Sequence, residues 1–229
     1  MKHNYTVQPV DFKLGEYMGK SINFYKDNFI RIFLGFLCLL VMCIFPFFAL
    51  LGVGNFYKFC ARIRNGEGAR FSEIFSFDDF VPCFKLFLII FALSFVFILP
   101  VSLFNLPVAQ RDFSKSASEI SFVSIIFYLV FIYLGVKAYY MIMAIALLRV
   151  RSIRKAWNLS VNMTKNHFFI IFVALLVANL LSYLGILLCF VGVIITLPFN
   201  YVFNYIAYED ALRQISTSEE IKEIYCVQE

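Results

Sequence analysis

The sequence predicts an all-α, polytopic helical membrane protein with about six membrane segments. Three observations support this fold class: the composition, the length of the uncharged intervals and an internal repeat. Of the 229 residues, 62% are hydrophobic and 15% are charged, whereas ordinary soluble domains are about 25% charged. So few polar side chains cannot cover a water-exposed surface, and we expect most of the chain to lie in a lipid bilayer.

Four long intervals, 32–57, 86–110, 120–148 and 168–208, contain no Asp, Glu, Lys or Arg except Lys137. A helix rises about 1.5 Å per residue, so about 20 apolar residues cross a hydrocarbon core of about 30 Å. Each interval is long enough to cross once, and the last is long enough to cross twice. Because acidic residues precede the first apolar run, we expect no cleaved signal peptide.

The stretch SINFYKDNFIRIF at 21–33 returns as SVNMTKNHFFIIF at 160–172. The matches are Ser21, Asn23, Lys26, Phe29, Ile32, Phe33 and Leu37 with Ser160, Asn162, Lys165, Phe168, Ile171, Phe172 and Leu176. The polar matches are the informative ones, because this chain is rich in Phe and Ile. We interpret the pair as a parallel internal repeat, in which an interfacial amphipathic helix leads into a helical hairpin. The alternative is shared composition alone.

The repeat divides the chain into a cytoplasmic interfacial helix at 1–28, a single membrane domain at 29–208 and an acidic cytoplasmic tail at 209–229. The membrane domain consists of hairpins at 29–61, 86–148 and 168–208, and the first hairpin turns near Pro46. This arrangement leaves 17 Lys and Arg residues inside and 2 outside, against 12 and 7 if 32–57 crosses once. Short cytoplasmic loops collect basic residues, which favours six segments with both termini cytoplasmic. Because its legs are short, the first hairpin could instead be partly re-entrant.

Three segments carry a family resemblance: RIRNGEGARFSEIFSF at 62–77, SIRKAWNLSVNMTKNHF at 152–168 and GILLCFVGVIITLPFNYVFNYIAYEDAL at 185–212. With these segments the sequence resembles the bacterial integral-membrane domain family related to the membrane domain of glycerophosphodiester phosphodiesterases and to YciC-like envelope proteins. The resemblance implies a multi-pass helical domain in the bacterial cytoplasmic (inner) membrane. The sequence departs from the family pattern at YLGVKAYY, residues 133–140. This segment keeps Gly135 but lacks the proline that members of the family often have beside the glycine. These residues contain no phosphodiesterase domain, so the resemblance implies no activity.

Basic residues beside the apolar intervals are the candidate lipid-binding residues. One loop contains four of them, Arg149, Arg151, Arg154 and Lys155, with no acidic residue between them. Such a cluster attracts anionic phospholipid headgroups, although it could serve only to set the topology. Lys137 is the fifth candidate, because a charge inside an apolar interval needs a partner such as a lipid phosphate. Alternatively, the Lys137 side chain extends to the membrane interface.

Thr196, Asn200 and Asn204 recur every four residues in the last apolar interval, which predicts a polar intramembrane face on one helix. Polar groups in hydrocarbon require partners, so this face is expected to point into the helix bundle. It would provide either interhelical hydrogen bonds or a polar track for a solute.

Catalytic chemistry is scarce in this sequence. His3 and His167 are the only histidines, no apolar interval contains a carboxylate, and the cysteines lack metal-ligand spacing. We expect no enzyme, no catalytic residue, no metal, no cofactor and no nucleic-acid partner. The sequence favours a non-enzymatic envelope protein that contacts anionic phospholipid. The alternatives are a small-solute transporter or channel, and a scaffold subunit that binds a protein partner or a second copy of the chain.

Overall fold

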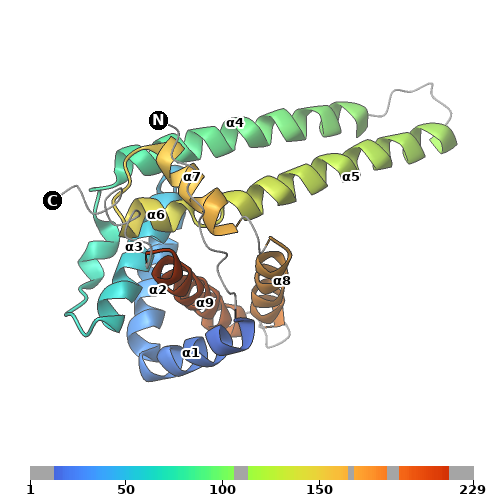
Figure 1. The fold of residues 1–229 in the computed structure, drawn as a ribbon. Helices are drawn as coiled ribbons and strands as arrows, with labels where there is room; N and C mark the ends of the chain where they lie inside the picture. Colours follow the sequence, from blue (N-terminus) through green and yellow to red (C-terminus); the bar gives the residue numbers. More distant parts are fainter. Residues whose placement is uncertain (1–12, 106–112, 165–167, 185–190, 217–229) are drawn as a thin grey trace.

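The computed structural model describes residues 13–105, 113–164, 168–184 and 191–216 (Figure 1). Within these ranges the regular elements are nine α-helices and one short 3-10 helix, with no β-strand. The all-α fold class is therefore confirmed. Residues 1–12 of the expected interfacial segment and 217–229 of the expected tail lie outside the described residues.

The first helix, α1 (Leu14–Asp27), has one buried face and one exposed face. Tyr17 and Ser21 are fully buried on it, whereas Glu16 and Lys20 are exposed and form an ion pair at 2.6 Å. Asn28 ends α1, and its backbone N–H and side-chain amide both donate to the carbonyl of Phe24, at 3.2 and 3.1 Å. Helix α2 (Phe29–Cys43) begins at the next residue.

Helices α2 and α3 (Pro46–Arg64) form a closely packed antiparallel hairpin. Its break directly precedes Pro46, which lies in the first turn of α3, where the missing N–H costs no helical hydrogen bond. Two glycines permit the close approach. A Cβ atom at Gly35 would lie 2.6 Å from the Phe59 ring, and one at Gly52 would lie 2.9 Å from Leu39.

The segment after α3 folds back against it through the 3-10 helix η1 (Phe71–Phe75). The buried Asn55 amide on α3 donates to the carbonyls of Ile74 at 3.0 Å and Ser76 at 2.7 Å. Two ion pairs, Lys58 with Asp79 and Arg62 with Glu73, join the same two segments. The two Asn55 bonds give hydrogen-bond donors to backbone carbonyls of this segment, and the ion pairs fix its side chains to α3.

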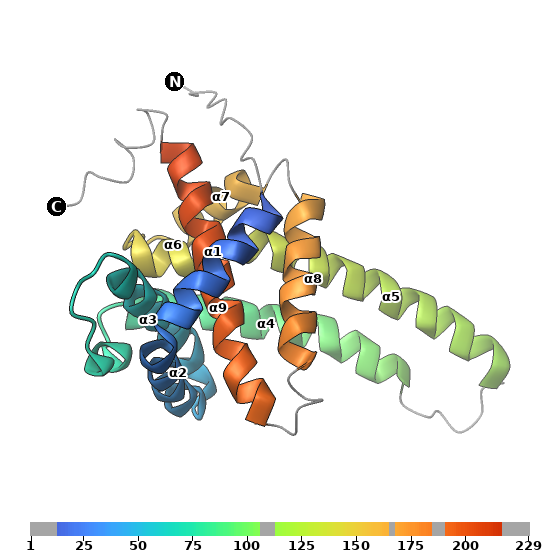
Figure 2. The same ribbon diagram turned by 90° about the horizontal axis from the view of Figure 1, so that it is seen from below.

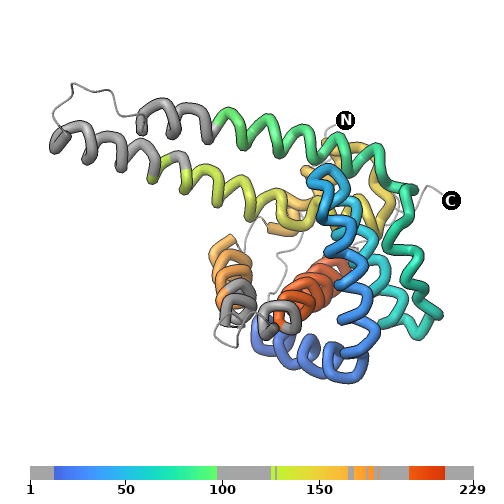
Figure 3. The backbone as a smooth tube through the Cα atoms, turned by 180° about the vertical axis from the view of Figure 1, so that it is seen from behind, coloured from blue at the N-terminus to red at the C-terminus, as the bar shows by residue number. Residues whose placement is uncertain are grey.

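Helices α4 (Phe80–Asn105) and α5 (Phe113–Ala138) form a long hairpin that projects from the other helices, as Figures 1 and 3 show from opposite sides. Many of its described side chains are apolar and exposed; the most exposed are Val81, Phe91, Phe95, Val96, Tyr128 and Leu129. Exposed apolar side chains in this number are typical of a surface that contacts lipid or protein.

The interval 120–148 does not form one continuous helix. Helix α5 ends at Ala138, and a separate short helix, α6 (Met141–Leu147), follows a turn. Helix α6 packs against α3 and against α7 (Ile153–Thr164), and its Met143, Ala144 and Ile145 are fully buried. The second half of the expected crossing is therefore part of the protein core.

Helices α8 (Phe168–Leu184) and α9 (Val191–Ser216) lie side by side (Figure 2). Helix α9 also packs against α1, α2 and α3, and it contributes the buried Val202, Phe203 and Tyr208 to the core. It runs without a break past Tyr208, so the boundary expected between membrane domain and tail falls inside this helix.

The two copies of the repeat occupy similar environments. Ser21 on α1 and Ser160 on α7 are fully buried, Ile32 on α2 and Ile171 on α8 are buried, and Leu37 and Leu176 are exposed. In both copies a short helix is followed by a break and then by an apolar helix. Lys165 lies outside the described residues, so the structure does not compare the environments of Lys26 and Lys165.

One stretch of the described residues, Tyr128–Leu147, is long and apolar enough to cross a membrane. Ile153–Thr164 and Phe168–Val177 reach the same length and hydropathy only together, as a pair bent by 97°. Phe29–Cys43 and Phe80–Val96 are apolar but shorter. By length and composition alone, the Tyr128–Leu147 stretch is weak evidence that the chain associates with a membrane, because it includes the buried helix α6.

Candidate functional site

The basic loop connects α6 to α7. Arg149 has a left-handed backbone with φ of 52°, which is the only positive φ of a non-glycine residue in the described ranges. It turns the chain at the end of α6, and the side chains of Arg149, Arg151, Arg154 and Lys155 are all exposed. Among the described residues, none of these four has a hydrogen bond or ion pair with another side chain. The loop therefore presents four uncompensated positive charges.

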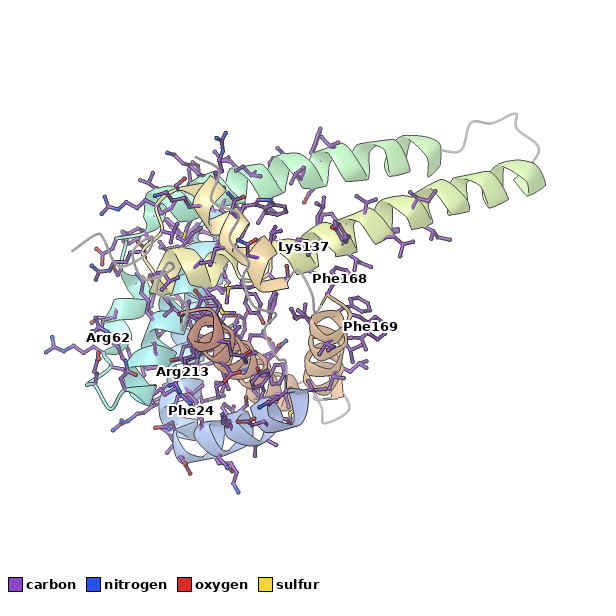
Figure 4. All side chains as sticks on the ribbon, in the orientation of Figure 1. Phe24, Arg62, Lys137, Phe168, Phe169 and Arg213 are labelled. Atoms are coloured by element: carbon purple, nitrogen blue, oxygen red, sulfur yellow. The ribbon has the colours of Figure 1, made fainter. Side chains whose placement is uncertain are left out.

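Lys137 lies apart from this loop. It is 8% exposed, and its Nζ donates to the carbonyl of Thr164 at 3.4 Å, in the last turn of α7. Of the four bases, Arg149 and Arg151 precede α7, and Arg154 and Lys155 lie in its first turn, about 16 Å from Thr164 by the helical rise. The Lys137 ammonium also lies 6.0 Å from the ring centroids of Tyr133 and Phe168, and Figure 4 shows it beside Phe168.

The contact of Lys137 with α7 has a simple electrostatic cause. The last carbonyls of a helix have no helical partner and carry partial negative charge, which favours a cation there. Ser160 reinforces the contact, because its Oγ donates to the Lys137 carbonyl at 2.6 Å and accepts from the Tyr140 N–H at 3.2 Å. Lys137 thus joins α5 to α7, and its ammonium group is directed into the protein.

The polar face of α9 is directed towards α3. Asn204 is 8% exposed, donates its amide to Asn200 Oδ1 at 3.0 Å, and lies beside the Tyr57 hydroxyl on α3. Asn200 and Thr196 are partly buried. The bond to Asn200 gives the Asn204 amide a partner within the protein, and the burial of Asn204 places it among the packed helices.

A polar pocket of about 520 Å³ lies where α1, the end of α3 and the end of α9 meet. Helix α1 lines it with Lys20, Asn23, Asp27 and Asn28. Lys20, Asn23 and Asp27 are three, four or seven residues apart, so they share one face of α1, and Asn28 directly follows the helix. This face was not among the predicted sites, although its spacing is visible in the sequence.

The far wall of the pocket is an ion-pair network between α3 and α9. Glu209 accepts a hydrogen bond from an Arg213 amino group at 2.6 Å through one oxygen, and its other oxygen forms an ion pair with Arg64 Nε, also at 2.6 Å. The Arg64 guanidinium also lies 5.9 Å from the Phe24 ring of α1. Nearby, the buried Tyr17 hydroxyl of α1 donates to Asp210 of α9 at 2.6 Å. Figure 4 shows Phe24 and Arg213 on this side of the molecule.

Within the described residues, no group of three or more His, Cys, Asp or Glu side chains has the arrangement of a metal site. No family model, curated protein or solved structure matches the chain. The chemical character of its own surfaces is therefore the basis for assigning a function.

Proposed function

We propose that this chain is a non-enzymatic, multi-pass protein of the bacterial cytoplasmic membrane, of the family it resembles, and that it binds anionic phospholipid on the cytoplasmic side. The observation that carries the proposal is the loop of four exposed bases without protein partners, Arg149, Arg151, Arg154 and Lys155. Each base near an anionic membrane surface contributes about 1 kcal/mol of attraction. Trp157 on α7 is partly buried beside the loop and is suited to the headgroup layer.

The exposed apolar surfaces support a membrane location. They occur on α2, on the α4–α5 hairpin and on α8, where Ile30, Phe91, Leu129 and Phe169 are each more than half exposed. In this proposal the six membrane segments are α2, α3, α4, α5, α8 and α9, and both termini are cytoplasmic. Helices α4, α5 and α9 have 26 residues each, which corresponds to about 39 Å. Helix α2, with 15 residues, fits a partly re-entrant first hairpin.

Lys137 is not part of the proposed lipid contact. Its side chain is buried and bound to α7, so it acts as a positioning residue that orients α7 and the loop before it. The burial of Asn204 and its hydrogen bond to Asn200 favour a structural role for the α9 face over a solute track.

Native mass spectrometry of the protein in mild detergent, with phosphatidylglycerol and phosphatidylcholine of the same acyl chains, tests this proposal. The first variant carries Arg149→Gln, Arg151→Gln, Arg154→Gln and Lys155→Gln. We expect the wild type to retain phosphatidylglycerol preferentially, and this variant to lose that preference by about tenfold or more.

A matched control neutralises four other exposed bases: Lys26→Gln, Arg31→Gln, Arg70→Gln and Lys85→Gln. The control is expected to keep the preference for phosphatidylglycerol. Equal losses in both variants would mean that the whole basic face attracts lipid without a site. An unchanged preference in the first variant would leave the loop as a topology signal.

A further inference from the structure

The pocket between α1, α3 and α9 combines both signs of charge. Its basic side chains are Lys20, Arg64 and Arg213, and its acidic ones are Asp27 and Glu209. Glu209 is already neutralised between the two arginines. Lys20 on α1 is paired with Glu16. The remaining groups are a basic wall of Arg64 on α3 and Arg213 on α9 and a separate carboxylate, Asp27, on α1.

The basic wall retains donors for a phosphate. Arg64 uses Nε for Glu209, and among the described residues its two amino groups have no acceptor. A guanidinium carries five N–H donors in a planar fork that matches phosphate oxygens. Phe24 lies against this guanidinium and limits its hydration on one side.

Asp27 is the unusual residue of the pocket. It is the last residue of α1, where the partial negative charge of the helix terminus disfavours a carboxylate. Its side chain is exposed and, within the part of the chain that the structure describes, has no cationic partner. A bound ammonium group would relieve this unfavourable placement.

An apolar stripe begins beside the pocket. Asn28, a lining residue, directly precedes α2, and the outward side chains of α2 recur every three or four residues: Ile30, Leu34, Leu37 and Val41. Ile30 at the start of the stripe is 71% exposed. The polar pocket suits the charged head of a ligand, and the apolar stripe suits a hydrocarbon chain attached to that head.

We propose that this pocket binds the zwitterionic headgroup of an aminophospholipid, with the phosphate on Arg64, the primary ammonium on Asp27 and an acyl chain along α2. The proposal rests on the membrane location argued above, but it uses a different site and a different lipid class. An anionic headgroup without an amine would leave Asp27 unpaired. A choline headgroup cannot donate an N–H to its carboxylate.

Native mass spectrometry with phosphatidylethanolamine, phosphatidylcholine and phosphatidylglycerol of identical acyl chains tests the proposal. The wild type is expected to retain phosphatidylethanolamine about tenfold better than phosphatidylcholine, because one charge-assisted hydrogen bond differs. Asp27→Asn is expected to abolish that preference without loss of folding, since the Asp27 side chain is exposed. Asp78→Asn, the same change at another exposed aspartate, should retain it.

Three outcomes would overturn the proposal. They are equal retention of the three lipids by the wild type, a preference that survives Asp27→Asn, and a preference that Asp78→Asn also removes. Soluble glycerophosphoethanolamine forms a further arm: binding as tight as that of the lipid would refute the role of the α2 stripe. The loop variant with four glutamines should keep the phosphatidylethanolamine preference, so the two proposals can fail independently.

Discussion

At the scale of single residues, Ser21 and Ser160, the two serines matched in the repeat, are both fully buried but have different hydrogen-bond partners. Ser160 links α7 to the turn between α5 and α6 through two hydrogen bonds with backbone groups. Ser21 donates only to the Tyr17 carbonyl, four residues earlier in its own helix. The internal repeat therefore preserves a residue type whose structural importance differs between the copies.

Replacing each serine by alanine tests this difference. Ser160→Ala leaves the Tyr140 N–H and the Lys137 carbonyl buried without that partner, so we expect a loss of about 2 kcal/mol of unfolding free energy. Ser21→Ala leaves helical hydrogen bonds intact and is expected to cost less than about 1 kcal/mol. Denaturant unfolding in detergent micelles measures both. Equal losses would contradict the assigned role of Ser160.

Tyr25 on α1 provides a prediction for alkaline pH. Its ring lies 5.4 Å from that of Phe29 and 6.0 Å from that of Phe199, and burial raises the pKa of Tyr25 to about 12 from its usual 10.0. Because the folded state holds the proton more tightly, the stability from this group is complete below pH 10 and is lost as the pH rises towards 12. Tyr25→Phe should reduce the fall in melting temperature across that window. An identical pH dependence in wild type and variant would contradict this.

At the scale of helices, the α2–α3 hairpin depends on glycine where α1 does not. A Cβ atom at Gly35 would overlap the buried Phe59 ring, whereas one at Gly19 on α1 meets nothing within 4 Å. The same substitution should therefore have opposite effects on stability at the two positions.

Gly35→Ala is expected to lower the unfolding free energy by about 2 kcal/mol, through overpacking between α2 and α3. Gly19→Ala is expected to raise it by up to about 1 kcal/mol, because alanine favours an exposed helix position. Thermal unfolding in detergent distinguishes the two. Stabilisation by Gly35→Ala would mean that α2 and α3 are less closely packed than described.

At the scale of the whole molecule, the α4–α5 hairpin determines how the chain meets the membrane. Phe91 near the middle of α4 and Val81 at its start are each 59% exposed. If the hairpin spans the bilayer, these equally exposed positions lie at different depths.

Phe91→Arg is expected to cost about 3 kcal/mol of insertion free energy, because the charge would lie near the centre of the hydrocarbon core. Val81→Arg should cost much less, since its side chain can reach the headgroup layer. Glycosylation mapping in microsomes reports the inserted fraction of each. Equal insertion of both variants would argue against a spanning hairpin.

Properties that depend on composition and local spacing were accessible from the sequence. The all-helical class follows from long apolar intervals, and the break before Pro46 lies where a turn near that residue was expected. The Arg149–Lys155 bases were identified because charge clustering needs no knowledge of tertiary contacts. The face of Lys20, Asn23 and Asp27 is equally visible in the sequence, but it was not among the predicted sites.

Contacts between distant segments could not be read in the same way. Lys137 looked like a candidate for lipid contact because its partner, the Thr164 carbonyl, is a backbone atom with no sequence signature. The polar pocket exists only because α9 brings Glu209 onto Arg64 beside α1. Local periodicity and composition were therefore sufficient for the helical class and for the candidate surfaces. The partners of buried charges depend on helix packing, because a side chain's environment is set by residues far away in the chain.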